Sequence, residues 1–203
     1  MAGGFDAALE AIAAGRIIVI AGDRLRGGDI DLMVAAKHVT PEAVNFMATH
    51  GRGLICLSVT PQRAEQLGLS LVNPGTARQT GRPFARSIEA AEGVSTGISA
   101  ADRAHTVQVA IAKGATSAHI HSPGHVFPLI ARPGGVLERP SACEASIDLA
   151  RLAGAGDAAV ICSIMRDDGE MARLDDIGEL IAGHGLEVAE IGALIARLQG
   201  AEA

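Results

Sequence analysis

The stretch VTPEAVNFMATHGRGLICLSV, residues 39–59, decides the fold class. Thr40 followed by Pro41 is a typical helix start, because a threonine hydroxyl caps free backbone amides and proline suits the first turn. The chain then passes through glycines into the apolar run GLICLSV, residues 53–59, which is typical of a buried strand. A helix followed directly by a buried strand predicts an α/β protein.

Helices and strands alternate along the rest of the chain. Phe5, Ala8, Leu9 and Ile12 share one face of a helix predicted at residues 5–14. The pattern has no internal repeat and no break in composition, so we expect one domain over residues 1–203, built on one main sheet. Further helices are predicted at 60–68, 100–113, 142–153, 179–184 and 191–198, and strands at 16–22, 32–36, 125–131, 158–165 and 186–191.

Composition excludes several classes of function. The chain has 203 residues, of which 48% are hydrophobic and only 2% aromatic, so the core must be built from Leu, Ile, Val and Ala. Its 23 acidic and 17 basic residues give a net charge of −6, which argues against general nucleic-acid binding because that requires a basic surface. Since no apolar run reaches the roughly 18 residues of a membrane span, we expect no membrane association.

The cysteines indicate a reducing compartment. The chain has three, with no CxxC spacing, which favours the cytoplasm, and the N-terminus does not resemble a signal peptide. Cys56 and Cys162 lie in strand-like apolar runs and are predicted to be small buried hydrophobic residues. Cys143 lies at the start of a predicted helix, where the helix N-terminus and nearby Arg139 would lower the pKa of its thiol and Glu144 would oppose them.

Three further segments combine polar groups at suggestive spacings. The glycine-rich loop 22–31 carries Asp29 and Asp31, which could hold a hard cation, move protons or simply be solvated. GVSTGISAADR, residues 93–103, places Thr96 and Ser99 before a helix, which suits a phosphate or ordinary capping. HIHSPGH offers three histidines, which could bind zinc or be unrelated: His119, His121 and His125.

Residues 70–86 form the longest irregular stretch. The segment is rich in Gly, Pro and Asn and carries Arg78, Arg82 and Arg86. Such a loop could close over a site or pack on a partner, and its composition leaves both possibilities open.

Taken together, these motifs resemble a known family. VTPEAVNFMATHGRGLICL, SIEAAEGVSTGISAADR, PGHVFPLIARPGGVLER and DDGEMAR are similar to segments of 3,4-dihydroxy-2-butanone 4-phosphate synthase. That family makes the four-carbon precursor of riboflavin from ribulose 5-phosphate and releases formate. The resemblance covers nearly the whole chain and implies a mixed sheet with helices on its faces. It also implies a homodimer with active sites near the subunit interface.

The first strand of the family leads into a catalytic loop from which this chain departs. The family loop reads D-R-E-N-E-G-D-L, and the aligned residues 25–32 read LRGGDIDL. Arg26 and Asp31 are kept. The glutamate that supports magnesium falls on Gly27, and the second glutamate falls on Asp29.

A second departure lies at the helix start. The family motif R-[AG]-G-H-T-E aligns with Arg139-Pro-Ser-Ala-Cys-Glu144, so the metal-binding histidine falls on Ala142 and the threonine on Cys143. The catalytic glutamate of C-E-[IL]-x-x-D-D-G falls on Ser163, whereas His125 of the P-G-H motif is kept. Because magnesium demands well-placed oxygen ligands, we expect no metal and no other cofactor, and magnesium only if the family reaction survives.

The resemblance therefore predicts a diverged enzyme. It would act as a lyase, isomerase or dehydratase on a small anionic or phosphorylated sugar-like substrate. Two alternatives stay open: a non-catalytic paralogue that binds a sugar phosphate or partners an active synthase, and a genuine synthase. The candidate catalytic residues are Asp29, Asp31, His125 and Cys143, and the candidate binding residues are Arg26, Arg139, Ser141, Cys143, Glu144, Ser163, Thr96 and Ser99.

Overall fold

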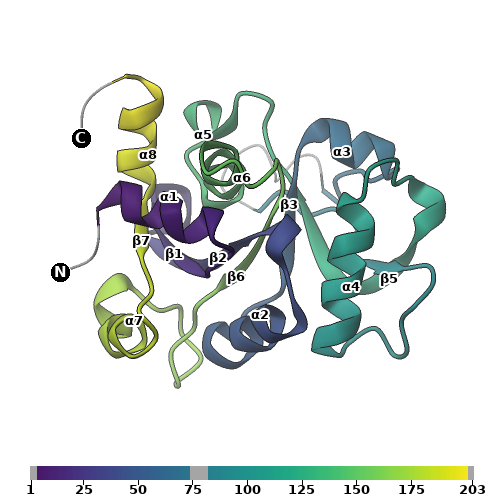
Figure 1. Cartoon of the computed structure of the whole chain (residues 1–203), viewed down its shortest axis with the longest axis horizontal. Helices are drawn as coiled ribbons and strands as arrows, with labels where there is room; N and C mark the ends of the chain where they lie inside the picture. Colours follow the sequence, from purple (N-terminus) through teal and green to yellow (C-terminus); the bar gives the residue numbers. More distant parts are fainter. Residues whose placement is uncertain (1–3, 74–81, 201–203) are drawn as a thin grey trace.

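The computed structural model describes residues 4–73 and 82–200, which form a mixed sheet with helices on both faces (Figure 1). The strand order is β4-β5-β3-β6-β2-β1-β7, with parallel β3–β5 and β1–β7 pairs and antiparallel pairs elsewhere. The predicted α/β class with a mixed sheet is confirmed. The strands are β1 Ile18–Asp23, β2 Asp29–Ala35, β3 Cys56–Val59, β4 Ile88–Ala90, β5 Ile120–Ile130, β6 Ala159–Ser163 and β7 Val188–Glu190.

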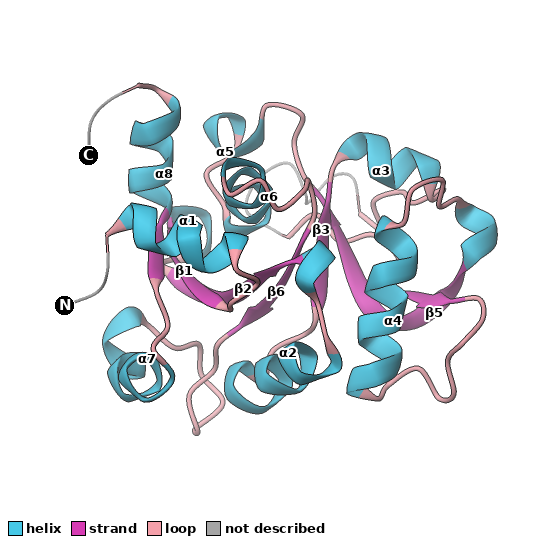
Figure 2. Cartoon of the chain, in the orientation of Figure 1, coloured by secondary structure: helices cyan, strands magenta, loops and turns pink. Residues whose placement is uncertain are grey.

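The helices divide between the two faces of the sheet (Figure 2). One face packs against α2, α3, α4 and α7, and the other against α1, α5, α6 and α8. Each face has its own aliphatic core, as the shortage of aromatic residues predicts. The helices are α1 Phe5–Ala13, α2 Pro41–Phe46, α3 Pro61–Gln66, α4 Ala100–Ile111, α5 Gly135–Glu138, α6 Ala142–Leu152, α7 Gly178–His184 and α8 Ile191–Leu198.

The helix starts follow the predicted chemistry. The Thr40 hydroxyl accepts a hydrogen bond from the Ala43 amide at 3.2 Å, and the Thr60 hydroxyl accepts one from the Arg63 amide at 3.1 Å. In both helices proline occupies the first turn. The short helix α5, by contrast, was not among the predicted helices.

The strand β2 alternates strictly between the two cores. Ile30, Leu32 and Val34 face the α2 and α4 side, whereas Met33 and Ala35 face α6. Because side chains alternate along a strand, Asp29 and Asp31 also belong to the α6 side. The prediction that residues 22–31 form a loop is therefore wrong over its last part, since β2 begins at Asp29.

The tight connection between β1 and β2 explains that early strand start. Gly27 and Gly28 adopt positive φ angles of 66° and 86°, which return the chain directly onto β1. Asp29 then pairs with Asp23 and Asp31 pairs with Ile20 across the two strands. Among the described residues, no helix is long and apolar enough to cross a membrane.

Candidate functional site

Asp31 is the centre of a buried polar group on the α6 face of β2. Its side chain has 0% exposure, and the side chain of Arg26 binds it from the β1–β2 connection. Arg26 Nη1 donates to Asp31 Oδ2 at 2.9 Å, and Arg26 Nη2 donates to Asp29 Oδ2 at 2.7 Å. The predicted pair of carboxylates therefore shares one guanidinium group.

Arg82 supplies a second guanidinium group to the same carboxylate. Its Nη2 contacts both Asp31 Oδ1 and the Ser163 hydroxyl. Ser163 lies opposite Asp31 on β6, and its Oγ donates to Asp31 Oδ1 at 2.8 Å. Burial alone would raise the pKa of Asp31, but Arg82 and Arg26 outweigh it and the pKa lies below its ordinary value.

Two more charged residues complete this group. Arg173 Nη1 donates to Asp29 Oδ1 at 2.7 Å from the segment that follows β6. Asp23, 1% exposed, lies 3.9 Å from Arg26 Nη1, and burial raises the pKa of its carboxyl group. We name the whole set the carboxylate–arginine cluster: Asp23, Asp29 and Asp31 with Arg26, Arg82 and Arg173, and the hydroxyl of Ser163.

The start of α6 touches this cluster. The Ala142 amide donates to Asp23 Oδ2 at 2.9 Å, so one free amide of the helix is satisfied by a buried aspartate. Cys143 is 3% exposed. Burial, with Glu144 second, raises the pKa of its thiol well above the ordinary value. The expected lowering of this pKa is therefore wrong, because desolvation outweighs the helix start and Arg139.

Arg139, Ser141 and Glu144 form a separate buried network beside that helix start. Ser141 Oγ donates to Glu144 Oε2 at 2.6 Å, and Arg139 Nη1 lies 3.3 Å from the same oxygen. The Arg132 amide donates to Glu144 Oε1 at 3.0 Å. Three predicted binding residues thus bind one another, and Glu144 has 0% exposure.

Thr96 and Ser99 lie in an exposed loop before α4. The Ser95 and Gly97 amides, which could have held a phosphate, both donate to the carboxylate of Asp102, at 3.3 and 3.0 Å. Ser99 Oγ accepts from the Asp102 amide at 3.0 Å as an ordinary helix cap. This arrangement matches the capping alternative.

His125 lies near that loop and away from Asp31. Its Nδ1 is 3.5 Å from Glu89 Oε1, and a Cβ added at Gly97 would overlap the Glu89 carboxylate. The strands β3 and β6 separate β5 from β2, which amounts to roughly 14 Å at ordinary strand spacing. His125 therefore cannot contact Asp31 within one chain.

The histidine-rich segment does not form the zinc site considered above. Residues 4–73 and 82–200 contain no group of three His, Cys, Asp or Glu side chains that could hold a metal ion. His119 Nδ1 instead accepts from the Thr116 amide at 3.1 Å, and His121 is exposed. Cys56 and Cys162 are buried in strands as predicted. Of the arginines in the irregular stretch, Arg78 lies outside the described residues.

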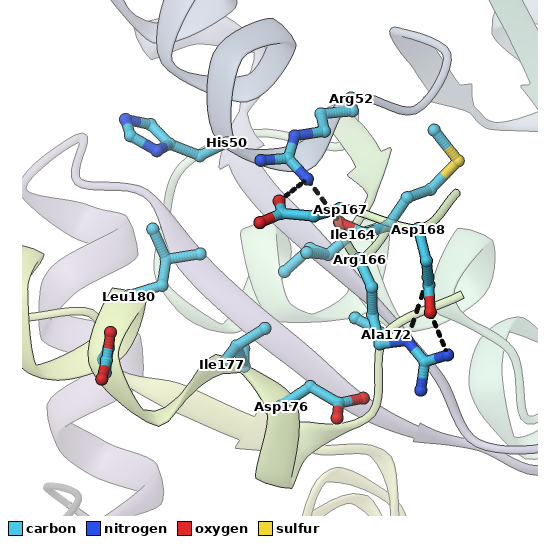
Figure 3. A pocket seen from close by; sticks show the side chains of 12 residues that line it. His50, Arg52, Ile164, Arg166, Asp167, Asp168, Ala172, Asp176, Ile177 and Leu180 are labelled. Atoms are coloured by element: carbon cyan, nitrogen blue, oxygen red, sulfur yellow. Dashed lines mark hydrogen bonds and ion pairs between the residues drawn. The ribbon is translucent and has the colours of Figure 1, made fainter. Parts of the chain in front are cut away.

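A separate hollow of about 680 Å³ lies on the opposite face of the sheet (Figure 3). Four of its charged residues form two ion pairs: Arg52 with Asp167 at 2.5 Å and Arg166 with Asp168 at 2.6 Å. It is not part of the predicted site. The lining residues are His50, Arg52, Ile164, Met165, Arg166, Asp167, Asp168, Ala172, Asp176, Ile177, Glu179 and Leu180.

Sequence reasoning missed three members of the carboxylate–arginine cluster as site residues: Asp23, Arg82 and Arg173. Arg82 stands out only as one of several arginines in an irregular segment, and Arg173 ends the motif DDGEMAR. The signal that could have found the two arginines is the pair of aspartates on a buried strand, because buried negative charges require positively charged partners.

Fold and site together define an α/β protein in which a charge-balanced polar cluster is buried between the sheet and the start of a helix. The chain belongs to the 3,4-dihydroxy-2-butanone 4-phosphate synthase family, whose model matches residues 6–197.

Individual relatives agree with this assignment. The chain is 51% identical over 192 residues to riboflavin biosynthesis protein RibBA of Aquifex aeolicus, which covers 94% of this chain and 47% of that protein. It is 48% identical over 190 residues to 3,4-dihydroxy-2-butanone 4-phosphate synthase of Pseudomonas aeruginosa, covering 94% and 52%. A solved synthase in complex with two magnesium ions superposes with a TM-score of 0.90 at 34% identity, covering 98% and 97%.

These similarities bear on the three hypotheses. The chain spans about half the length of the curated relatives named above. The relatives' names favour a genuine synthase over a diverged enzyme, and nothing in the comparisons supports divergence of function. The expectation of a metal-free site is likewise unsupported by them, because a solved relative holds magnesium.

The residues of this chain do not fit a magnesium ion. Magnesium takes oxygen ligands in a near-octahedral arrangement. Here both oxygens of Asp31 and both of Asp29 already accept hydrogen bonds from guanidinium groups. Position 142, where the resemblance implies a histidine ligand, is an alanine, and position 27 is a glycine.

Proposed function

We propose that the chain binds a small sugar phosphate, or a similar anion, and moves protons on it without magnesium. The carboxylate–arginine cluster supports this proposal, because its three carboxylates and three guanidinium groups balance in charge without a metal ion. A fixed guanidinium group stabilises a developing enolate oxygen in the same way as other preorganised positive charge.

The cluster divides the chemical tasks. Asp31 is ionised and held by two arginines, so it orients them rather than accepting a proton readily. Asp23 has a raised pKa and sits between Arg26 and the start of α6, which suits a group that gains and loses a proton. Arg26 and Arg82 are the guanidinium groups of the cluster that would hold the oxyanion of a substrate.

We further propose a homodimer in which a second copy completes the site. Thr96, Ser99 and His125 lie on a part of the chain that cannot reach Asp31 within one subunit. An interface that brings this part against the cluster of the other copy would reconcile the two halves of the predicted site. Light scattering coupled to size-exclusion chromatography tests the dimer directly.

The complete synthase reaction is the second candidate. It is favoured by identities of 48 to 51% to the relatives named above, one of which is named a synthase. It demands loss of water, a skeletal shift and release of formate from ribulose 5-phosphate, the substrate that the family resemblance implies.

Proton NMR in D₂O with ribulose 5-phosphate separates the candidates. The proposal expects exchange of the C3 proton without formate and without dependence on Mg²⁺, and expects Asp31→Asn to abolish the exchange. Formate that depends on Mg²⁺ would instead establish the synthase reaction. If the sugar phosphate binds but shows neither C3 proton exchange nor formate release, the chain is a non-catalytic paralogue.

A further inference from the structure

We propose that Arg82 is the resident cation of this site, a guanidinium group whose single positive charge on Asp31 takes the part of a metal ion there and keeps a divalent ion out. The inference deepens the proposed metal-independent function and rests on it for its chemical meaning. The contacts of one side chain carry it.

The buried Asp31 carboxylate requires positively charged partners. A fully buried carboxylate must be neutralised where it stands, because it has no access to water. Its Oδ2 accepts from Arg26 at 2.9 Å, whereas its Oδ1 is held by Arg82 together with the hydroxyl of Ser163. Arg82 is thus the second positive charge on a single carboxylate.

The contacts of its own segment with β5 fix the position of Arg82. The backbone just after it is anchored to β5, where Phe84 bridges Leu129 and the Ala85 amide donates to the Pro128 carbonyl. The side chain lies over β3, with Nη1 3.6 Å from Cys56 Sγ, and its Nη2 contacts Ser163 on β6 and Asp31 on β2. It is 12% exposed, so the charge lies against the sheet and is largely shielded from solvent.

Arg82 and a divalent metal ion would compete for the Asp31 carboxylate. A divalent ion at Asp31 would displace Arg82 from Oδ1 or face two guanidinium groups at close range. Arginine stays protonated at any ordinary pH, so this obstacle does not titrate away. Ser163 offers a hydroxyl where a carboxylate would supply a stronger ligand, which weakens the case for a metal further.

The test uses Mn²⁺ alone, followed by the electron paramagnetic resonance of the free ion. The unaltered chain is measured beside three variant proteins: Ala142→His, Ala142→His with Arg82→Gln, and Ala142→His with Arg82→Lys. Position 142 is chosen because its backbone amide lies 2.9 Å from Asp23 Oδ2, so the residue borders the cluster. Glutamine keeps a donor for Asp31 and Ser163 but removes the charge, whereas lysine keeps the charge.

We expect the Arg82→Gln protein to bind Mn²⁺ roughly tenfold or more tightly than either of the others, since one unit of like charge has been removed. Equal affinity in all three proteins, or no binding by the Arg82→Gln protein, would overturn the inference. So would tight Mn²⁺ binding by the unaltered chain. Circular dichroism establishes that each variant is folded. Because no substrate is present, a chain without catalytic activity can still pass this test.

Discussion

The substitution Glu144→Gln tests whether the network at the start of α6 holds the fold or holds a ligand. The Glu144 carboxylate accepts from the Arg132 amide at 3.0 Å and from Ser141 Oγ at 2.6 Å, and it pairs with Arg139 at 3.3 Å. Glutamine retains the shape but points an amide N–H₂ group at one of these donors. Arg139 then keeps its charge in a buried place but loses the pairing with Glu144.

Breaking a buried ion pair from one side destabilises a protein by about 3–5 kcal/mol. We expect the lower part of that range, because Arg139 also donates to Ser141 at 3.2 Å. In a chain of this size, a loss of about 3 kcal/mol corresponds to a melting temperature lower by roughly 6–12 °C. Urea unfolding followed by circular dichroism measures the free energy directly.

Two variants serve as controls for Glu144→Gln. Arg151→Ala removes an exposed ion pair with Asp148 and should change the unfolding free energy by no more than about 0.5 kcal/mol. The double variant Arg139→Met with Glu144→Met removes both charges and should be less destabilising than Glu144→Gln alone. A change below about 1 kcal/mol for Glu144→Gln, accompanied by loss of sugar phosphate binding, would refute the structural role argued here.

Three further predictions follow from the packing and burial of other groups. Gly124→Ala places a Cβ 2.2 Å from the Ile88 backbone and should lower the unfolding free energy by about 1–3 kcal/mol or more. Gly183→Ala in α7, where a Cβ would meet nothing within 4 Å, should raise it by up to about 1 kcal/mol. The same urea unfolding experiment compares the two variants. Ellman's reagent at pH 8 should label no thiol in the folded chain and all three thiols after unfolding. Burial raises the pKa of Cys56 to about 11 and of Cys162 to about 12, and Cys143 is buried as well. Rapid labelling of the native protein would contradict this prediction. Burial, His184 and Arg52 lower the pKa of His50, so the midpoint of its NMR titration should lie below pH 6.5. Because the unfolded chain takes up this proton at a higher pH than the folded chain, His50 should destabilise the fold as the pH drops below 6.5. A titration midpoint above pH 6.5 would contradict this prediction.

The sequence by itself determined most of the elements and the class of the fold, although it did not predict α5, β4 or the early start of β2. Threonine–proline pairs at 40–41 and 60–61 start helices because a hydroxyl and a fixed φ angle act within one turn, whatever lies beyond. Apolar runs such as 158–165 become buried strands because their side chains leave no polar face. The family motifs, which span most of the chain, also pointed to the β1–β2 segment, the start of α6 and the end of β6, but not to Arg82.

Only the tertiary structure decided what the charges in those segments do. Residues 22–31 look like a solvated glycine loop, yet Asp31 is buried because Arg26, Arg82 and Ser163 reach it from three different segments. Cys143 looks activated by its helix, yet burial raises the pKa of its thiol. Both outcomes depend on desolvation and on partners distant in the chain, and spacing along a sequence records neither.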